Sequence, residues 1–131
     1  MKNLFFAFFI VLLTSSCGPD RENFEPKDPA AFNAQIADRT DISTPEELIL
    51  LYYNYQEEEG EPDIKVSTVK SKNSYEITLI HDRLLDDSMR AEKILMTAEK
   101  NGNSWAVQNI RTNWKCWEGR GHTDWGIEWC K

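Results

Sequence analysis

The residues best suited to chemistry lie near the C-terminal end of the sequence. All five tryptophans fall between positions 105 and 129, and Trp117, Trp125 and Trp129 share their segment with Arg120 and His122. Exposed indole rings stack on sugar rings or on the side chains of a partner. An arginine and a histidine set among glycines can meet an anion or a carboxylate. These five residues are therefore the candidate contacts for a ligand or a partner.

The same residues also have a structural interpretation. The tryptophans can pack this segment back onto a sheet and enlarge a small core, because each buries a large area. Arg120 can pair with Glu118 or Asp124, and His122 can bond to a backbone carbonyl. The residue types favour this structural interpretation, and ligand contact is the second hypothesis.

Motifs for metal, phosphate or nucleophilic chemistry are missing from the sequence. The two histidines, His81 and His122, have no spacing to acids or cysteines that is typical of a zinc site. Neither a calcium-binding loop nor a phosphate-binding glycine loop is present. Ser88, His81 and Asp82 offer the residue types of a catalytic triad, but without a nucleophile elbow. We therefore expect no metal, no cofactor and no catalytic residue, and a protein that is not an enzyme.

The N-terminus has the pattern of a secretory signal peptide over residues 1–16. Lys2 supplies the positive charge, and the apolar run from Leu4 to Leu13 is too short to span a bilayer. The five residues ending at Cys17 (Leu-Thr-Ser-Ser-Cys) resemble a bacterial lipobox, although Thr14 stands where the usual box has an aliphatic residue. The resemblance implies a lipoprotein of a Gram-negative bacterium, lipidated on Cys17 and anchored at the periplasmic or surface face of the outer membrane. A plain secretory signal followed by an incidental cysteine is the alternative.

The chain has three cysteines, an odd number for an exported protein. If Cys17 carries lipid, Cys116 and Cys130 are left to form a disulfide, which closes a loop of about 15 residues and stabilises the fold by about 3 kcal/mol. The segment from Trp114 to Cys130 resembles the ending of small uncharacterised exported bacterial proteins with a Trp-Lys/Arg-Cys…Gly-Arg-Gly-His…Cys pattern. That resemblance implies a structural motif rather than an activity.

Length and charge limit the function further. Removing residues 1–16 leaves 115 residues, enough for one domain, and removing Lys2 with them takes the net charge from −7 to −8. Such an acidic domain argues against nucleic acid as a partner, because phosphates are bound by lysine and arginine.

Residues 17–41 are predicted to be a lipidated cysteine followed by a tether, and residues 42–131 a small domain. Within the tether, Asp28 and Pro29 can start a short helix. The main helix is predicted to begin at Thr44, because Thr44 and Glu47 form a capping box. Its apolar stripe consists of Leu48, Leu51, Tyr52 and Tyr55. We expect this helix to continue toward Gly60, which can take a left-handed C-cap.

The rest of the domain is predicted to be a sheet. Alternating segments at 64–68 and 75–79 indicate two strands, and 104–115 indicates another. Residues 89–99 fit either a helix or a strand, and the hairpin signal Asn101-Gly102 favours the strand. The result is an α+β fold in which one N-terminal helix packs on a four-stranded antiparallel sheet, followed by a disulfide-stapled C-terminal loop. This order of elements resembles the cystatin-like arrangement.

These patterns lead to one functional hypothesis and one alternative. We expect a lipid-anchored cell-envelope protein that acts by binding, as an accessory or partner-recognition module. The alternative is a lipoprotein that binds a carbohydrate or small ligand through exposed tryptophans of the C-terminal loop. An envelope protein and a glycan are the corresponding partners.

Overall fold

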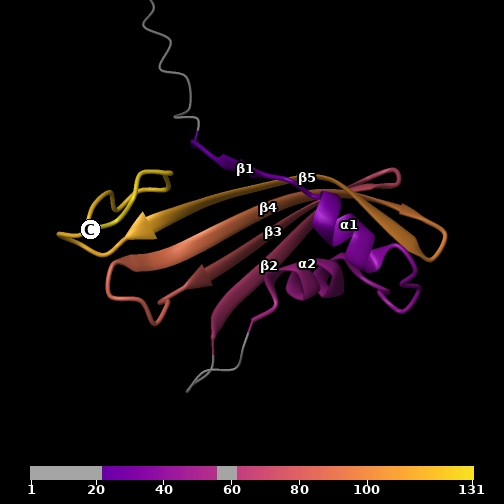
Figure 1. Cartoon of the computed structure of the whole chain (residues 1–131), viewed down its shortest axis with the longest axis horizontal. Coiled ribbons are helices and arrows are strands. Elements are labelled where there is room, and N and C mark those ends of the chain that lie inside the picture. The colour runs from indigo at the N-terminus through magenta and orange to yellow at the C-terminus, as the bar shows by residue number, and fades with distance from the viewer. Residues whose placement is uncertain (1–21, 56–61) are drawn as a thin grey trace, which may run out of the picture.

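The computed structural model describes residues 22–55 and 62–131 (Figure 1). The predictions for Met1 to Ser16, Cys17 and Gly60 lie outside these residues. The described chain forms an α+β fold of two short helices and a five-stranded antiparallel sheet. The elements are β1 (Glu25–Lys27), α1 (Ala30–Ile36), α2 (Pro45–Tyr53), β2 (Asp63–Ser71), β3 (Ser74–Asp82), β4 (Met89–Asn101) and β5 (Ser104–Cys116).

The sheet has the strand order β1-β5-β4-β3-β2, so β2 to β5 form a meander and β1 joins its outer edge. Both helices cover one face of the sheet (Figure 1). The core lies between the helices and that face, because the strands turn alternate apolar side chains toward it. Its buried members are Phe32, Ile36, Ile42, Leu48, Ile49, Ile77, Leu79, Ile94, Met96, Ala98, Trp105, Val107 and Ile110.

The start of α2 confirms the predicted capping box. The Thr44 side chain accepts a hydrogen bond from the Glu47 amide at 3.1 Å, and the Glu47 carboxylate accepts one from the Thr44 amide at 3.3 Å. Pro45 occupies the first helical position, where its missing N–H has no cost.

The predicted end of this helix is wrong. The helix stops at Tyr53, because Asn54 adopts a left-handed conformation with φ of 46° and donates its amide to the Leu50 carbonyl at 3.0 Å. Asparagine is the residue that most often replaces glycine at this position. Tyr55, which the apolar stripe included, therefore lies beyond the helix.

The strands and hairpins follow the sequence closely. Residues 89–101 form strand β4, which settles the choice between helix and strand. Two hairpin turns of two residues each, 72–73 and 102–103, join β2 to β3 and β4 to β5. Lys72 and Gly102 begin these turns with φ values of 56° and 61°. Asn101 is thus the last residue of its strand rather than part of the turn.

The N-terminal segment differs most from expectation. Residues placed in a tether form β1, which pairs with β5 so that Glu25 lies opposite Thr112, and α1, whose start is bonded to the Asp28 side chain. The short helix is therefore confirmed, but the prediction of one helix on four strands is corrected to two helices on five. Strand β1 has three residues, one of them Pro26, so it shows no alternation; an edge position is where a strand tolerates proline.

Candidate functional site

The predicted disulfide between Cys116 and Cys130 is present, with an S–S distance of 2.03 Å. It fixes the C-terminal loop, residues 117–131, to the end of β5. The backbone of the loop also returns to that strand. Trp114 and Gly126 exchange amide–carbonyl hydrogen bonds of 2.9 and 3.0 Å, and the Cys116 amide donates to the His122 carbonyl at 2.8 Å. The loop therefore has a defined backbone although it contains neither helix nor strand.

Two glycines allow this close packing. Gly121 has a φ of 153°, and a Cβ added there would lie 2.7 Å from the Cys116 sulfur. A Cβ at Gly126 would lie 3.1 Å from the His122 ring. At both positions a side chain would displace groups that hold the loop together.

His122 joins two parts of the loop through its ring. Its Nδ1 lies 2.8 Å from the Asp124 carbonyl oxygen, and its Nε2 lies 2.8 Å from the Glu128 carbonyl oxygen. The predicted bond from His122 to a backbone carbonyl is thus present, and both ring nitrogens are directed at the loop itself.

Arg120 does not make the ion pair that the sequence suggested. It is exposed, and a guanidinium N–H donates to the Lys131 carbonyl at 3.4 Å. Neither Glu118 nor Asp124 pairs with it among the ion pairs of the described residues. Arg120 therefore keeps most of its donors available to solvent or a ligand.

Trp117 connects the loop to the turn between β3 and β4. Its indole N–H donates to the Asp86 carbonyl and its amide donates to the Ser88 carbonyl, both at 2.9 Å. The Arg90 guanidinium lies 5.8 Å from the ring centroid. Trp117 is half-buried, and its hydrogen bonds hold the loop against this turn.

Trp125 packs between lysines on the strands. The Lys93 and Lys115 ammonium groups lie 4.2 and 4.7 Å from its ring centroid, a distance typical of cation–π contacts. Lys93 also binds the Glu22 carboxylate at 2.6 Å, and the Asn113 amide donates to the same oxygen at 3.3 Å. Glu22, the first described residue, is therefore held beside Trp125.

The charges around Glu22 also change its protonation. Burial acts to raise the pKa of Glu22, but hydrogen bonds from Lys93 and Asn113 and the charges of Lys93 and Lys115 outweigh it. The pKa of Glu22 consequently lies below its ordinary value of 4.5. This carboxylate is charged, and bound to Lys93, over the neutral pH range.

Trp129 differs from the other tryptophans because it is 83% exposed. One side of its ring meets Trp114, with centroids 5.8 Å apart, and Trp114 itself is buried and donates its indole N–H to the Glu128 carbonyl. Ile127 and Leu85 are also exposed, and their loops lie at the same end of the sheet (Figure 1). We refer to Leu85, Ile127 and Trp129 as the exposed end.

A second cluster of titratable groups lies under α2, where the sequence had not placed a site. The Tyr53 hydroxyl is 2.7 Å from Nδ1 of buried His81, and the rings of Tyr53 and Tyr55 meet the imidazole edge to face. Glu92 is the register partner of His81 on β4. Burial raises the pKa of Glu92, and burial together with nearby Glu92 and Tyr55 raises the pKa of Tyr53 to about 12. The alternation of Ile77, Leu79 and His81 along β3 is the sequence signal that could have placed this histidine in the core.

The residue types of a catalytic triad are not brought together. His81 and Asp82 are neighbours on β3, so their side chains point to opposite faces of the sheet. Asp82 accepts a hydrogen bond from Arg90 at 3.2 Å, and the Ser88 hydroxyl donates to Asp86 at 3.0 Å.

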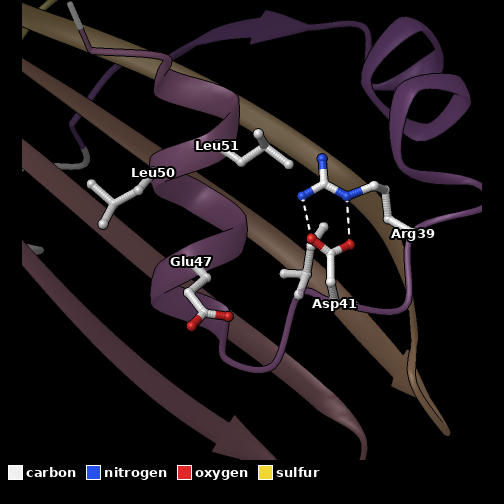
Figure 2. A pocket seen from close by; sticks show the side chains of 6 residues that line it. Arg39, Asp41, Glu47, Leu50 and Leu51 are labelled. Carbon is white, nitrogen blue, oxygen red and sulfur yellow. Dashed lines mark hydrogen bonds and ion pairs between the residues drawn. The ribbon is translucent and has the colours of Figure 1, made fainter.

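A shallow pocket of about 310 Å³ lies between α2 and the segment that precedes it (Figure 2). Figure 2 shows Arg39 directed at Asp41, with two hydrogen bonds of 2.6 and 2.7 Å. Glu47 serves the cap of α2. Because its charged side chains are already paired, this pocket is a weaker candidate than the exposed end. It is lined by Arg39, Asp41, Ile42, Glu47, Leu50 and Leu51.

Across 22–55 and 62–131, no three His, Cys, Asp or Glu side chains gather closely enough to hold a metal ion. No helix in this part of the chain has the length and apolar character needed to cross a membrane. Comparison with known proteins finds no matching family model, no matching curated protein and no matching solved structure.

Proposed function

We propose that this protein is a lipid-anchored cell-envelope protein that acts by binding, as an accessory or partner-recognition module. Its contact surface is the exposed end. The observation that carries the proposal is the 83% exposure of Trp129 on a backbone fixed by the disulfide and by His122. A large aromatic side chain on a rigid loop loses little conformational freedom on binding, and tryptophan is the residue most enriched at binding hot spots.

The lipid anchor is supported by the sequence around Cys17, and export to the cell envelope is supported by the disulfide. Disulfides are typical of oxidising compartments such as the cell envelope. The helix α2 and the meander that follows it also agree with the cystatin-like arrangement that we propose for this part of the fold.

A carbohydrate or small ligand is the second candidate for the same surface. Arg120 favours it, because its exposed guanidinium lies in the same loop as Trp129 and can bind hydroxyl or carboxylate oxygens. Fluorescence titration with sugars distinguishes the two, because stacking on Trp129 changes its emission in the wild type and not in Trp129→Phe.

The proposal is tested by hydroxyl-radical footprinting of the protein in intact envelopes and after purification. We expect Trp129 to be oxidised several-fold more slowly in the envelope, where a partner covers it. Leu50, exposed on α2 and away from this end, is the internal reference. Equal oxidation of Trp129 in both states would contradict binding through the exposed end. The intact mass of the same preparation shows whether the chain begins at a lipidated Cys17.

A further inference from the structure

We propose that the exposed end binds the lipid surface that carries the protein's own anchor, with Trp129 inserted at the membrane–water interface. This inference rests on the proposed function, because it requires lipid on Cys17. It identifies the partner of the exposed end as a membrane surface of stated lipid type.

The link between the proposed anchor at Cys17 and the sheet is short. Glu22 is held by Lys93 at 2.6 Å and by Asn113 at 3.3 Å, so the chain is fixed to the sheet at this residue. Four residues, 18–21, separate Glu22 from Cys17, so the link has five Cα–Cα steps. Whatever conformation residues 18–21 adopt, this link spans at most about 18 Å. The lipid therefore holds the domain close to the bilayer.

The link joins the sheet beside the C-terminal loop. The Lys93 ammonium that binds Glu22 also lies over the Trp125 ring, and residue 126 pairs with Trp114, whose ring contacts Trp129. The anchor thus enters at the end of the sheet that carries the C-terminal loop.

The opposite end of the sheet is out of reach of the link. Asn113, which holds Glu22, lies nine positions from Ser104 on β5, or about 30 Å, so the hairpin at 102–103 lies beyond the reach of about 18 Å that the link has from Glu22. Val69, another exposed apolar residue, lies near the hairpin at 72–73 and on β2, the edge strand farthest from β1. Trp129 is the large exposed apolar group that the anchor brings to the membrane.

The residue types of the exposed end suit a membrane–water interface. An indole ring is amphipathic and concentrates at the membrane interface. Within residues 117–131, the carboxylates of Glu118, Asp124 and Glu128 are nearly balanced by Arg120 and Lys131. The domain as a whole is acidic, so anionic headgroups would repel it. A neutral, zwitterionic lipid surface therefore fits the exposed end best. Because the anchor keeps the exposed end at a high local concentration beside the membrane, even a weak contact is occupied.

The experiment uses the mature chain with lipid on Cys17, reconstituted in phosphatidylcholine vesicles that contain brominated phosphatidylcholine. If the intact mass shows that Cys17 carries a free thiol, a phospholipid is coupled to it through a maleimide. The contact of Trp129 with lipid is then tested even without a native anchor. We expect the brominated lipid to quench wild-type fluorescence and to leave Trp129→Phe unchanged. Melting curves of both proteins establish that the fold is retained.

Two controls sharpen the result. Val69→Trp in the Trp129→Phe background places a ring at the far edge and should not be quenched. A long Gly/Ser insertion between Arg21 and Glu22 keeps the anchor and should reduce the quenching of Trp129. Absence of quenching at Trp129, or equal quenching at position 69, would overturn the proposal. If Trp129 is shielded in native envelopes but not on these vesicles, the partner is a protein or glycan, and the proposed function stands without the membrane contact.

Discussion

The C-terminal loop and the helix-covered face of the sheet keep their shapes by different means. On the helix-covered face, α1 and α2 bury a continuous apolar cluster. None of residues 117–131 is buried, yet their backbone is fixed by the disulfide, by the two carbonyl contacts of His122 and by the close approach of Gly121 to sulfur. One region is stabilised by hydrophobic burial and the other by covalent and polar geometry.

This difference explains how a small domain can present a large apolar ring to solvent. A loop held by burial would have to bury Trp129 to stay ordered. A loop held by a covalent bond and hydrogen bonds leaves that ring free for binding. The following substitutions separate the two kinds of stabilisation.

Leu48→Ala should give the largest effect. Leu48 is fully buried between α2 and the sheet, so its truncation should lower the free energy of unfolding by about 2–5 kcal/mol, measured by urea denaturation. Leu50→Ala, on the same helix but 42% exposed, is the matched control and should cost less than about 1 kcal/mol. Similar losses for both variants would mean that burial under α2 does not dominate stability.

Replacing both Cys116 and Cys130 by serine should lower the free energy of unfolding by about 3 kcal/mol, the value for a closed loop of this length. Hydrogen exchange should show where the loss falls. The Gly126 amide, bonded to Trp114, should lose protection, while amides between β3 and β4 keep theirs under native conditions. If the Gly126 amide stayed protected, the loop would be held by its polar contacts alone.

Gly121→Ala should lower the free energy of unfolding by about 1–3 kcal/mol, because its backbone conformation is unfavourable for alanine and the new Cβ meets the Cys116 sulfur. Gly119→Ala is the control: its φ of 81° is also unfavourable, but no atom lies within 4 Å of the added Cβ. The difference in urea midpoint between the two variants measures the cost of the steric clash between the new Cβ and the Cys116 sulfur. No difference would show that the loop can shift away from the disulfide.

The same contrast separates what the sequence could predict from what it could not. Burial produces periodic patterns, so the strands of the meander, the start of α2 at Thr44 and the core position of Ile77 follow from residue spacing. The end of α2 does not, because an apolar stripe continues to Tyr55 and the stop depends on the backbone of Asn54.

The candidate site was predicted by residue type, and its geometry was not. Tryptophan content drew attention to the C-terminal loop, but the exposure of Trp129 depends on how Trp114 and His122 hold the backbone around it. The position of Glu22 could not be predicted either, since its partner Lys93 lies 71 residues away in the sequence. Contacts of this kind depend on the completed sheet and leave no local pattern.

Glu92→Gln should give the smallest effect, and it tests the polar part of the helix-covered face. Glu92 faces this side between His81 on β3 and Trp114 on β5, and burial raises its pKa, against the opposing charge of Lys27. A raised pKa means that the folded protein binds the proton more tightly than the unfolded chain does. Its contribution to stability is therefore complete well below 4.5, the ordinary value, and is lost as the pH rises through the raised pKa.

Glutamine removes this ionisation. Urea denaturation should find Glu92→Gln about as stable as the wild type well below pH 4.5, and more stable at neutral pH by on the order of 0.5 kcal/mol. Glu99→Gln, at an exposed position of the same strand, controls for the loss of one carboxylate from an acidic protein. If Glu92→Gln were less stable at neutral pH, the charged carboxylate would have a favourable partner in Lys27. The helix-covered face would then depend on polar geometry as the C-terminal loop does.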